Sequence, residues 1–320
     1  MAPPQRMRIL ITGANGFVGR HLIEALNSLP DTPEIIAATH GEIGPALGTL
    51  RSEPLDVTNA EQTLALIRET QPTHLMHLAG IAAVSNASDD VRKTWHVNAQ
   101  GTLNVALAIQ QGAPQCRLIF CSSAQVYGRN FQSGIPLAED VRLDPVNIYA
   151  SSKAAADILI GQMSGEGLRA VRLRPFNHIG PGQSREFVVS SFASQIAAIE
   201  RGTQAPTIKV GNLSMRRDFL DVRDVVEAYV QAILRFDDLP NGAVFNIASG
   251  HAVAVEDILK VLLSMSIKKI EVVADPKRMR LNDTEVMAGN ANAARHALQW
   301  RPRWSLHDSL QSVLDYFRRP

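Results

Sequence analysis

The stretch TGANGFVG, Thr12 to Gly19, follows a short apolar run and opens a segment with leucines at helical spacing. It therefore predicts a tight turn from a β-strand into an α-helix, whether or not a ligand binds there. Gly13 permits the turn, Gly16 lets the backbone approach a pyrophosphate, and Gly19 allows the helix to pack closely. The free N–H groups at the start of such a helix favour an anion. We expect a bound dinucleotide to contact Gly13, Asn15, Gly16, Phe17, Val18 and Gly19.

Short apolar runs alternate with helical segments through the first half of the chain, which is the pattern of βαβ units and a parallel sheet. The runs are nearly continuous in apolar residues, as expected of strands covered by helices on both faces. We predict an α/β fold, a Rossmann-type doubly wound parallel sheet with a smaller, discontinuous C-terminal substrate lobe. Helices are expected near Trp95–Gln110 and Tyr149–Met163. The predicted strands are Arg8–Thr12, Ile35–Ala38, Leu75–Leu78, Leu118–Cys121 and Ala170–Leu173.

The chain changes character beyond Arg174, where the loop PFNHIGPGQ leads into basic segments and further helices. Those helices are predicted near 188–201, 225–236 and 255–264. The run VFNIA between the last two has the pattern of another sheet strand. We therefore predict that residues 1–175 form the dinucleotide-binding domain, to which a strand returns at about 236–250. Residues 176–235 and 260–320 are predicted to form the second lobe.

Composition excludes several classes of protein. The chain has 320 residues, 45% of them hydrophobic, with 32 basic and 31 acidic residues and a formal net charge of +1. So balanced a charge provides no field to hold nucleic acid or an anionic membrane. Two cysteines are too few for a secreted disulfide scaffold, and no metal-ligand spacing accompanies them. No apolar run approaches the roughly 18 residues of a membrane helix, so we expect a cytoplasmic protein. We also expect that the protein uses no metal.

Two further segments fit a bound dinucleotide. Asp56 and Val57, in LDV, follow the expected third strand, where the Asp56 carboxylate would receive the adenine amino group. An ordinary N-cap or loop aspartate is the alternative. The segment HLAG ends another strand in small residues, which would let Leu78, Ala79 and Gly80 pass close to the cofactor. Simple packing is the alternative for that segment.

The end of the second predicted strand bears on the choice of cofactor. A carboxylate about 20 residues beyond the glycines normally binds the adenosine ribose hydroxyls of NAD. This chain has Thr39 and His40 there, with Glu42 slightly beyond. We therefore expect NADPH or NADH to serve, with NADPH slightly preferred.

Tyr149 and Lys153, in YASSK, lie one helical turn apart and share a helix face. A neighbouring ammonium favours the phenolate of a tyrosine, which makes a poor acid or base useful near neutral pH. Ser123, at the end of the predicted strand in IFCSS, would lie beside the cofactor. Ser122 is the alternative for that role, and a solvated helix face is the alternative for the pair. Tyr127 is another phenol, but it has no lysine one turn away.

The chain resembles the extended short-chain dehydrogenase/reductase family, in its nucleotide-sugar branch. The resemblance covers nearly the whole chain, because the family's motifs appear in order. They are TGANGFVG, LDVTN, HLAG, VNAQGTLN, SSAQVYG, YASSK, RPFNHIGPGQ and RRDFLDVRDV. Within the branch, the segments RPFNHIGPGQ, SMRRDFLDVRD and DPKRMR are most similar to reductases of GDP-linked 4-keto-6-deoxymannose.

The resemblance implies roles for single residues. Ser123, Tyr149 and Lys153 would form the catalytic triad. Asn98, in VNAQGT, would hold a water that links Lys153 to solvent. An asparagine that only satisfies backbone groups is the alternative for Asn98. Pro175 would contact the nicotinamide through its backbone.

Other residues are implied to bind the substrate. Asn177 would touch the sugar or a phosphate, and Arg217 and Arg280 would hold the diphosphate, a task suited to guanidinium. A solvated surface is the alternative for each arginine. Related dehydratases carry an acid shortly after the catalytic serine, a role that Ala124 and Gln125 cannot fill. The implied substrate contacts are Ser123, Gln125, Asn177, Arg217 and Arg280.

The expected activity is reduction by NAD(P)H of the C4 keto group of a nucleotide-linked 4-keto-6-deoxyhexose. GDP-4-keto-6-deoxy-D-mannose is the expected substrate and GDP-D-rhamnose the product. One alternative is a nucleotide-sugar C4 epimerase that keeps NAD tightly bound. An alternative of another class is a non-catalytic, cofactor-sensing regulatory protein, against which the complete triad argues. The family resemblance also implies a homodimer made by the helices near Trp95–Gln110 and Tyr149–Met163.

Overall fold

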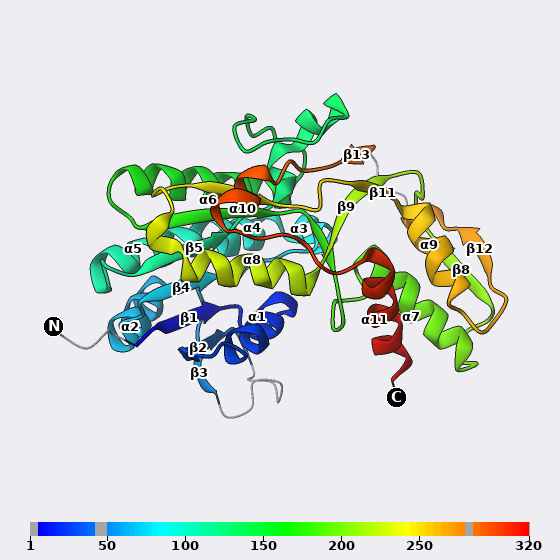
Figure 1. Ribbon diagram of the computed structural model, residues 1–320, viewed down its shortest axis with the longest axis horizontal. Helices are drawn as coiled ribbons and strands as arrows, with labels where there is room; N and C mark the ends of the chain where they lie inside the picture. The colour runs from blue at the N-terminus through cyan, green and yellow to red at the C-terminus, as the bar shows by residue number, and fades with distance from the viewer. Residues whose placement is uncertain (1–5, 42–49, 279–283, 320) are drawn as a thin grey trace.

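A computed structural model describes residues 6–41, 50–278 and 284–319 of the chain. Its centre is a seven-stranded parallel sheet in the order β10-β6-β5-β4-β1-β2-β3 (Figure 1). The strand order reverses between β1 and β4, the point at which ligands bind in doubly wound folds. The strands are β1 (Arg8–Thr12), β2 (Glu34–Thr39), β3 (Arg51–Pro54), β4 (His74–His77), β5 (Arg117–Cys121), β6 (Ala170–Pro175) and β10 (Val244–Ile247).

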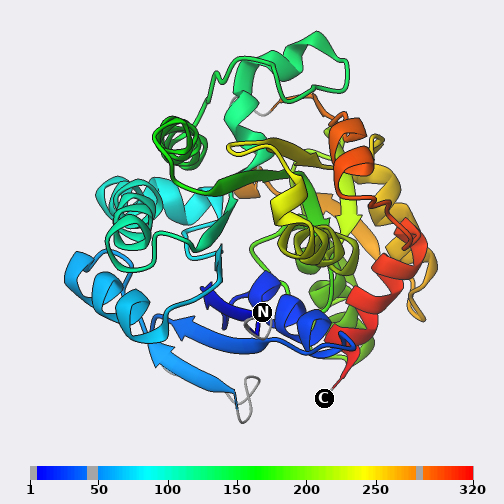
Figure 2. The same ribbon diagram turned by 60° about the vertical axis from the view of Figure 1, so that its left-hand side comes forward.

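Helices cover both faces of this sheet (Figures 1 and 2). On one face, α1 (Phe17–Asn27) packs against α8 (Val222–Leu234). The other face is covered by α2 (Ala60–Thr70), α5 (Gly101–Gly112) and α6 (Ile148–Gly165). The predicted Rossmann-type α/β class is therefore confirmed. Within the described ranges, no helix has the length and apolar character needed to span a membrane.

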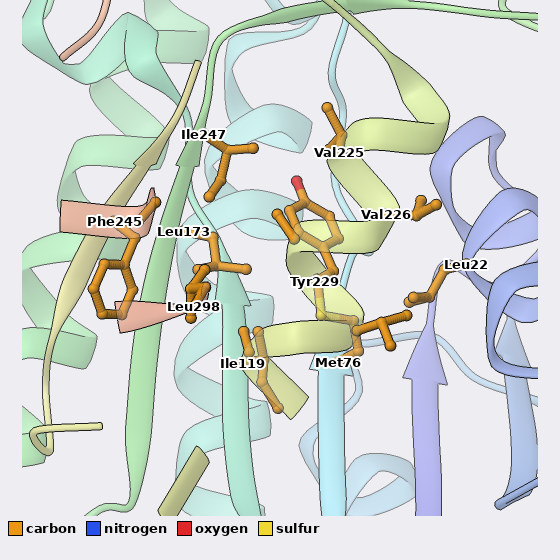
Figure 3. Close-up of a cluster of buried hydrophobic side chains, with 14 of the residues drawn as sticks. Leu22, Met76, Ile119, Leu173, Val225, Val226, Tyr229, Phe245, Ile247 and Leu298 are labelled. Carbon is orange, nitrogen blue, oxygen red and sulfur yellow. The ribbon is translucent and has the colours of Figure 1, made fainter. Parts of the chain in front are cut away.

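Strand β1 shows why these residues form a sheet with two covered faces. Successive side chains of a strand point to opposite faces, and Ile9, Leu10 and Ile11 are all fully buried. Ile9 and Ile11 belong to the apolar cluster under α1 and α8, whereas Leu10 belongs to the cluster under α2, α5 and α6. Figure 3 shows the first cluster, in which Leu22 of α1 and Tyr229 of α8 lie over the strands.

The later part of the chain builds a smaller lobe with its own apolar cluster. Three helices pack together there, namely α7 (Val188–Glu200), α9 (Val255–Ser264) and α11 (Leu306–Arg318). A four-stranded sheet joins β7 (Asn177–Ile179), β9 (Arg216–Asp221), β11 (Ala252–Ala254) and β13 (Val286–Met287), while β8 (Thr207–Val210) pairs with β12 (Glu271–Ala274). The lobe takes stretches from both sides of β10 in the sequence, so it is discontinuous.

Two helices inside the predicted bounds of the second lobe pack against the large sheet instead. Helix α8 contacts α1, and its buried residues belong to the cluster on that face of the sheet. Helix α10 (Asn292–Ala297) contacts β10. An amphipathic pattern shows that a helix has a buried face, but not which partner covers it. The domain boundaries given above remain a prediction, and α8 belongs with the dinucleotide-binding half.

The helix predicted near Trp95–Gln110 is interrupted. The chain forms α3 (Val84–Asp89), α4 (Val91–Trp95), a single π-helical turn η2 (His96–Gln100) and then α5. Such turns are rare and occur often at functional sites. The remaining short helices are the 3₁₀ segments η3 (Ala124–Ser133), η4 (Phe236–Asp238) and η5 (Pro276–Arg278).

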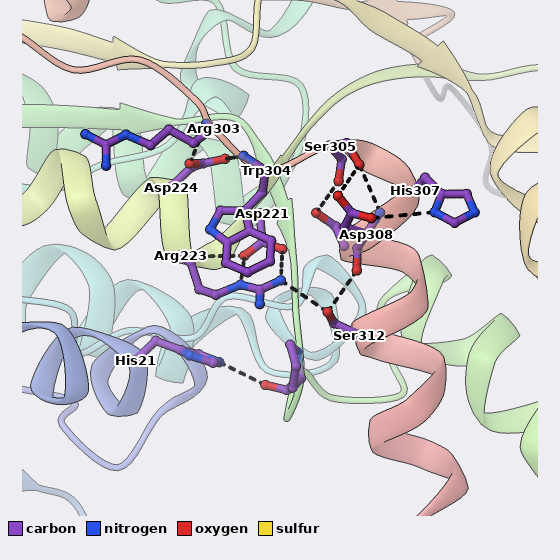
Figure 4. Close-up of polar contacts among 12 residues, drawn as sticks. His21, Asp221, Arg223, Asp224, Arg303, Trp304, Ser305, His307, Asp308 and Ser312 are labelled. Atoms are coloured by element: carbon purple, nitrogen blue, oxygen red, sulfur yellow. Dashed lines mark hydrogen bonds and ion pairs between the residues drawn. The ribbon is translucent and has the colours of Figure 1, made fainter.

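A polar junction joins α8 of the large half to α11 of the lobe (Figure 4). Asp221 caps α8 by accepting a 2.8 Å hydrogen bond from the Arg223 backbone N–H. The Arg223 guanidinium donates to the same carboxylate at 2.6 and 2.7 Å and lies 3.2 Å from the ring centroid of Trp304. It also donates to Ser312 Oγ of α11 at 3.3 Å. Arg223 thus contributes to the contact between the two parts, together with Asp224, which accepts from the Arg303 and Trp304 N–H groups.

A buried ion pair fixes α6 to the sheet. Asp157 of α6 is 0% exposed and Arg174 of β6 is 4% exposed. Two nitrogens of Arg174 donate to the two carboxylate oxygens, each at 2.9 Å. Arg174 also donates at 2.9 Å to the hydroxyl of Tyr127, which in turn donates at 2.8 Å to Asn246 of β10. Burial opposes the charge on Asp157, but the hydrogen bonds from Arg174 hold its pKa below the ordinary value.

Arg174→Met should therefore destabilise the protein strongly, because it leaves only the single 3.0 Å contact from Arg172 to balance the buried Asp157 carboxylate and removes the donor to Tyr127. We expect a loss of about 3–5 kcal/mol in the free energy of unfolding, measured by urea denaturation. The exposed pair of Arg129 and Asp144, at 2.9 Å, provides the control. Arg129→Met should cost less than about 1 kcal/mol. Equal losses in the two variants would contradict the structural role given to the buried pair.

Candidate active site

The turn after β1 leaves no room for side chains. Gly13 has a φ of +70°, and a Cβ there would lie 2.8 Å from the backbone nitrogen of Ala79. A Cβ on Gly19 would lie 2.6 Å from the carbonyl oxygen of Ala14. The first glycine therefore lets β1 turn against the end of β4, and the last lets α1 start against the turn itself.

The start of α1 is open to an anion. Its N-cap is Gly16, which is exposed and has no side chain to bond the first N–H groups. The first turn begins Phe17, Val18 and Gly19, none of which is acidic. A negatively charged group is stabilised at such a helix end. With the bare backbone at Gly13 and Gly16, this turn fits the pyrophosphate of a dinucleotide.

The other predicted cofactor contacts lie at the same edge of the sheet. Asp56 Oδ1 accepts hydrogen bonds from the N–H and the hydroxyl of Thr58, at 2.9 and 2.7 Å, and the Thr58 hydroxyl lowers the pKa of Asp56. Val57 is buried, and a Cβ on Gly101 would lie 2.7 Å from Val57 Cγ2. Asp56 thus stabilises the loop before α2, which is the alternative stated for it, and contact with adenine remains a prediction.

The segment after β4 runs beside the glycine turn. The Leu78 N–H donates to the Thr12 carbonyl at 3.2 Å, and the Ala79 N–H donates to the Thr12 hydroxyl at 3.2 Å. A Cβ on Gly80 would lie 3.0 Å from Asn98 Oδ1. Small residues are needed here because the chain passes between β1 and the π-helical turn.

The Ser123 side chain lies close enough to the Tyr149 phenol to lower its pKa. Ser123 is 6% exposed, lies just past β5 and accepts a hydrogen bond from the Gln125 N–H at 3.2 Å. Tyr149 is in the first turn of α6, which Asn147 caps by accepting from the Ala150 N–H at 2.8 Å. Burial raises the pKa of Tyr149 to about 12, although Ser123 acts in the opposite direction. At neutral pH the phenol therefore keeps its proton.

Lys153 lies on the same helix but makes a different contact from the one predicted. It is 7% exposed, its Nζ donates to the carbonyl of Cys121, and it stands 4.7 Å from the ring centroid of Phe120. Burial lowers the pKa of Lys153, whereas Cys121 and Asp157 act to raise it. Burial, and not the ammonium, thus dominates the pKa of Tyr149, opposite to the direction expected from the sequence.

The structure also separates the alternatives for the serine and the phenol. Ser123 acts on the pKa of Tyr149, whereas Ser122, 2% exposed just past β5, acts on that of Asp157, which favours Ser123 for the predicted role. Tyr127 is fully buried, and its hydroxyl lies between Arg174 and Asn246. Tyr127 is therefore part of the core network.

Asn98 lies in the π-helical turn with its amide fully engaged in the fold. Its Nδ2 donates to the Ile81 carbonyl at 3.1 Å and to Ser152 Oγ at 3.0 Å, and its Oδ1 accepts from the Ile81 N–H at 2.8 Å. This matches the alternative in which the asparagine satisfies backbone groups. Its part in holding a water beside Lys153 remains a prediction. Ser152 was not singled out from the sequence, although it lies within YASSK.

The predicted substrate residues of the described chain gather around β9. Asn177 begins β7, which pairs with β9, and Pro175 ends β6 just before it. Arg217 of β9 is paired with Met287 of β13, and Met287 Sδ lies 4.0 Å from Gln125 Nε2. Arg217 Nη1 donates to its neighbour's carbonyl, Arg216 O, at 2.9 Å.

Two residues named from the sequence, Glu42 and Arg280, lie outside the residues that the structure describes. The cofactor and diphosphate contacts assigned to them remain predictions.

Comparison with known proteins agrees with this geometry. The model of the NAD dependent epimerase/dehydratase family matches residues 9–248. The chain belongs to this family. It is 33% identical to GDP-6-deoxy-D-mannose reductase of Pseudomonas aeruginosa over 96% of both chains. The structure of RMD from Pseudomonas aeruginosa complexed with NADPH superposes with a TM-score of 0.84, at 32% identity over 98% of this chain and 99% of that one.

An epimerase is also among the similar structures. The UDP-glucose 4-epimerase of Thermus thermophilus in complex with NAD has a TM-score of 0.85, at 26% identity over 98% of this chain and 99% of that one. The resemblance to the nucleotide-sugar branch of the extended short-chain dehydrogenases/reductases is thus confirmed, for sequence and for fold.

Gly13→Ala should weaken cofactor binding, because its Cβ would meet the Ala79 backbone. We expect at least a roughly tenfold rise in the Kd for NADPH, about 1.4 kcal/mol, measured by fluorescence titration. Gly134→Ala is the matched control, since Gly134 has a φ of +71° but nothing within 4 Å of its Cβ position. The control should lose stability without a change in Kd. An unchanged Kd in Gly13→Ala would contradict the assignment of the turn.

Proposed function

We propose that this protein reduces the C4 keto group of a nucleotide-linked 4-keto-6-deoxyhexose with NADPH or NADH. We further propose that the substrate is GDP-4-keto-6-deoxy-D-mannose and the product GDP-D-rhamnose. The observation that carries the proposal is that Ser123, just past β5, and the protonated phenol of Tyr149 lie near each other at the same edge of the sheet as the glycine turn. The similarity to a GDP-6-deoxy-D-mannose reductase supports the choice of substrate.

The residues of the chain divide the chemistry among them. The reduced nicotinamide, when bound, supplies the hydride. Tyr149 donates its proton to the carbonyl oxygen as that oxygen gains negative charge, and Ser123 donates a hydrogen bond to the same oxygen. Lys153, one turn further along α6, stabilises the phenolate that remains. Gly13, Gly16 and the start of α1 would hold the pyrophosphate.

Reduction is favoured over its alternatives. Dehydration needs a further acid or base after the serine, and Ala124 and Gln125 provide neither. An epimerase would use the same serine, tyrosine and lysine, so the preference for reduction rests on the similarity to a GDP-6-deoxy-D-mannose reductase. The epimerase with tightly bound NAD and the non-catalytic cofactor sensor therefore remain the second and third candidates.

The proposed cofactor is NADPH in preference to NADH. At the end of β2, Thr39 is buried and His40 is exposed, so the position that normally carries a ribose-binding carboxylate has none at these two residues. The structurally similar RMD from Pseudomonas aeruginosa was solved with NADPH. The diphosphate of the substrate is assigned to Arg217, together with Arg280, and the sugar to Ser123, Gln125 and Asn177.

Tyr149→Phe should abolish most of the activity, because it removes the proton donor and leaves the ring. With GDP-4-keto-6-deoxy-D-mannose and NADPH as substrates, we expect kcat to fall by about two to four orders of magnitude. The assay measures the decrease in NADPH absorbance. Tyr316→Phe, at a phenol 39% exposed on α11, should leave kcat unchanged.

The product distinguishes the candidates. GDP-D-rhamnose, identified by NMR, with one NADPH consumed per product, is the expected result. Interconversion of nucleotide sugars without added reductant would identify the epimerase, and NADPH binding without turnover would identify the sensor. Retention of more than a tenth of the activity by Tyr149→Phe would contradict the role of Tyr149 as proton donor.

We also propose a homodimer. Trp95 of α4, Leu107 of α5 and Ile158 of α6 are 39%, 38% and 60% exposed, and α4 and α5 each contact α6. Large apolar side chains gathered on adjacent helices are typical of an interface between subunits. A second copy of the chain is the partner that the family resemblance implies for these helices.

Ile158→Arg should convert the dimer into a monomer, because it places a charge in the centre of the apolar contact. Light scattering after size exclusion, at a concentration where the unaltered protein is dimeric, measures the change. Ile267→Arg is the control, since Ile267 is 77% exposed but follows α9 in the other lobe. Dissociation by the control, or a dimer that survives Ile158→Arg, would contradict this interface.

A further inference from the structure

A run of buried polar side chains connects the glycine turn to the catalytic helix, and His77 of β4 lies at its centre. His77 is 1% exposed. Its Nδ1 lies 2.7 Å from the hydroxyl of Thr12, the last residue of β1, and its Nε2 lies 3.1 Å from the hydroxyl of Thr102 in α5. Thr12 and Thr102 are each 1% exposed, so protein groups must satisfy both hydroxyls.

The neighbours of the two threonines determine which nitrogen of His77 carries the proton. Thr12 Oγ1 accepts from the Ala79 N–H at 3.2 Å, so its own proton is available for His77 Nδ1. Thr102 donates its proton to the Asn98 carbonyl at 2.7 Å, so its oxygen accepts from His77 Nε2–H. Each hydroxyl has one proton to donate. The neutral imidazole protonated on Nε2 therefore satisfies all of these contacts at once.

The other protonation states break the run. With the proton on Nδ1, the Thr12 hydroxyl would lose its acceptor, and Thr102 would have to release Asn98 to donate to Nε2. In an imidazolium both ring nitrogens carry protons, so Nδ1 could not accept a hydrogen bond from the Thr12 hydroxyl. Burial, and next the charge of Lys153, lower the pKa of His77 to about 3, so the ring is neutral near pH 7.

The run continues from Asn98 to the catalytic tyrosine. Asn98 Nδ2 donates to Ser152 Oγ at 3.0 Å, and Ser152 Oγ donates to the Tyr149 carbonyl at 2.8 Å. Ser152 is 0% exposed. The π-helical turn contributes both groups of Asn98, its carbonyl toward Thr102 and its amide toward Ser152. The backbone that carries the phenol of Tyr149 is thus connected to the backbone that forms the cofactor turn.

We propose that His77 is a positioning residue: as a neutral imidazole protonated on Nε2, it holds the glycine turn and Tyr149 in register through Thr12, Thr102, Asn98 and Ser152. It touches neither substrate nor cofactor in this role. The kinetic consequence rests on the proposed function through the proton donor Tyr149. The protonation state of His77 does not, since it follows from the hydrogen bonds alone.

The first experiment observes the ring directly. Long-range ¹H–¹⁵N NMR spectra of the full chain, labelled in histidine, distinguish a protonated ring nitrogen from one that accepts a hydrogen bond. The signals absent from His77→Phe identify the residue. We expect Nε2 protonated and Nδ1 unprotonated near pH 7. A proton on Nδ1, or on both nitrogens, would overturn the proposal whatever reaction the protein catalyses.

The second experiment breaks this run of hydrogen bonds by replacing Thr102 with a residue of similar shape. Thr102→Val removes the acceptor for His77 and should lower kcat about tenfold, equivalent to about 1.4 kcal/mol, with little change in the KM for the nucleotide sugar. Thr102→Ser keeps the hydroxyl and should restore kcat. Thr70→Val is the matched control, since Thr70 is also 1% exposed but donates at 2.7 Å to Leu66 within its own helix.

The control should lose stability without losing kcat. An equal loss of kcat in Thr70→Val, or no rescue by Thr102→Ser, would reduce His77 to a structural residue and overturn the proposal. Full activity in Tyr149→Phe would instead remove the proposed function and leave the NMR result standing. The two failures are thus distinguishable.

Discussion

The contact between Gly13 and the backbone of Ala79 is the constraint on which the rest of the site depends. The backbones that follow β1 and β4 approach each other closely at the point where the strand order reverses. Only glycine permits this approach, since a Cβ at Gly13 would lie 2.8 Å from Ala79 N. The same approach lets the Thr12 hydroxyl accept from Ala79 and reach His77. Helix α1 starts directly after this turn, so its open N–H groups lie at the carboxyl edge of the sheet.

Burial sets the electrostatics of the catalytic helix. Desolvation raises the pKa of Tyr149 and lowers that of Lys153, so it favours the neutral form of each group. Asp157, one turn beyond Lys153, acts against this loss of charge and is itself held by Arg174. The ion pair that holds α6 against β6 therefore also supplies the nearest negative charge to Lys153 on its own helix. Stability and chemistry share the same buried carboxylate.

The sequence was sufficient for the parts of the fold that depend on local pattern. The strand at Arg8–Thr12 and the helix at Val255–Ser264 have the predicted ends, because apolar periodicity and turn residues determine them. The π-helical turn at His96–Gln100, the packing of α8 on α1 and the contact of Lys153 with Cys121 were missed. Each depends on a partner distant in sequence, so no local pattern contains it. Ser123 and Tyr149 could be proposed as site residues because their motifs are local, whereas His77 could be read from the sequence only as the end of a strand.

One of the contacts between the lobe and the large half lies close to Ser123. Gln125 follows Ser123 closely and touches Met287, which pairs with Arg217 on the central strand of the lobe's sheet. A movement of the lobe relative to the large sheet must therefore carry the Ser123 loop with it or break this contact. Ser123 in turn lies close enough to Tyr149 to act on the pKa of the phenol. The proposed binding of the nucleotide sugar by the lobe and the proposed proton transfer from Tyr149 therefore meet near Gln125, whereas the glycine turn belongs to the large sheet alone.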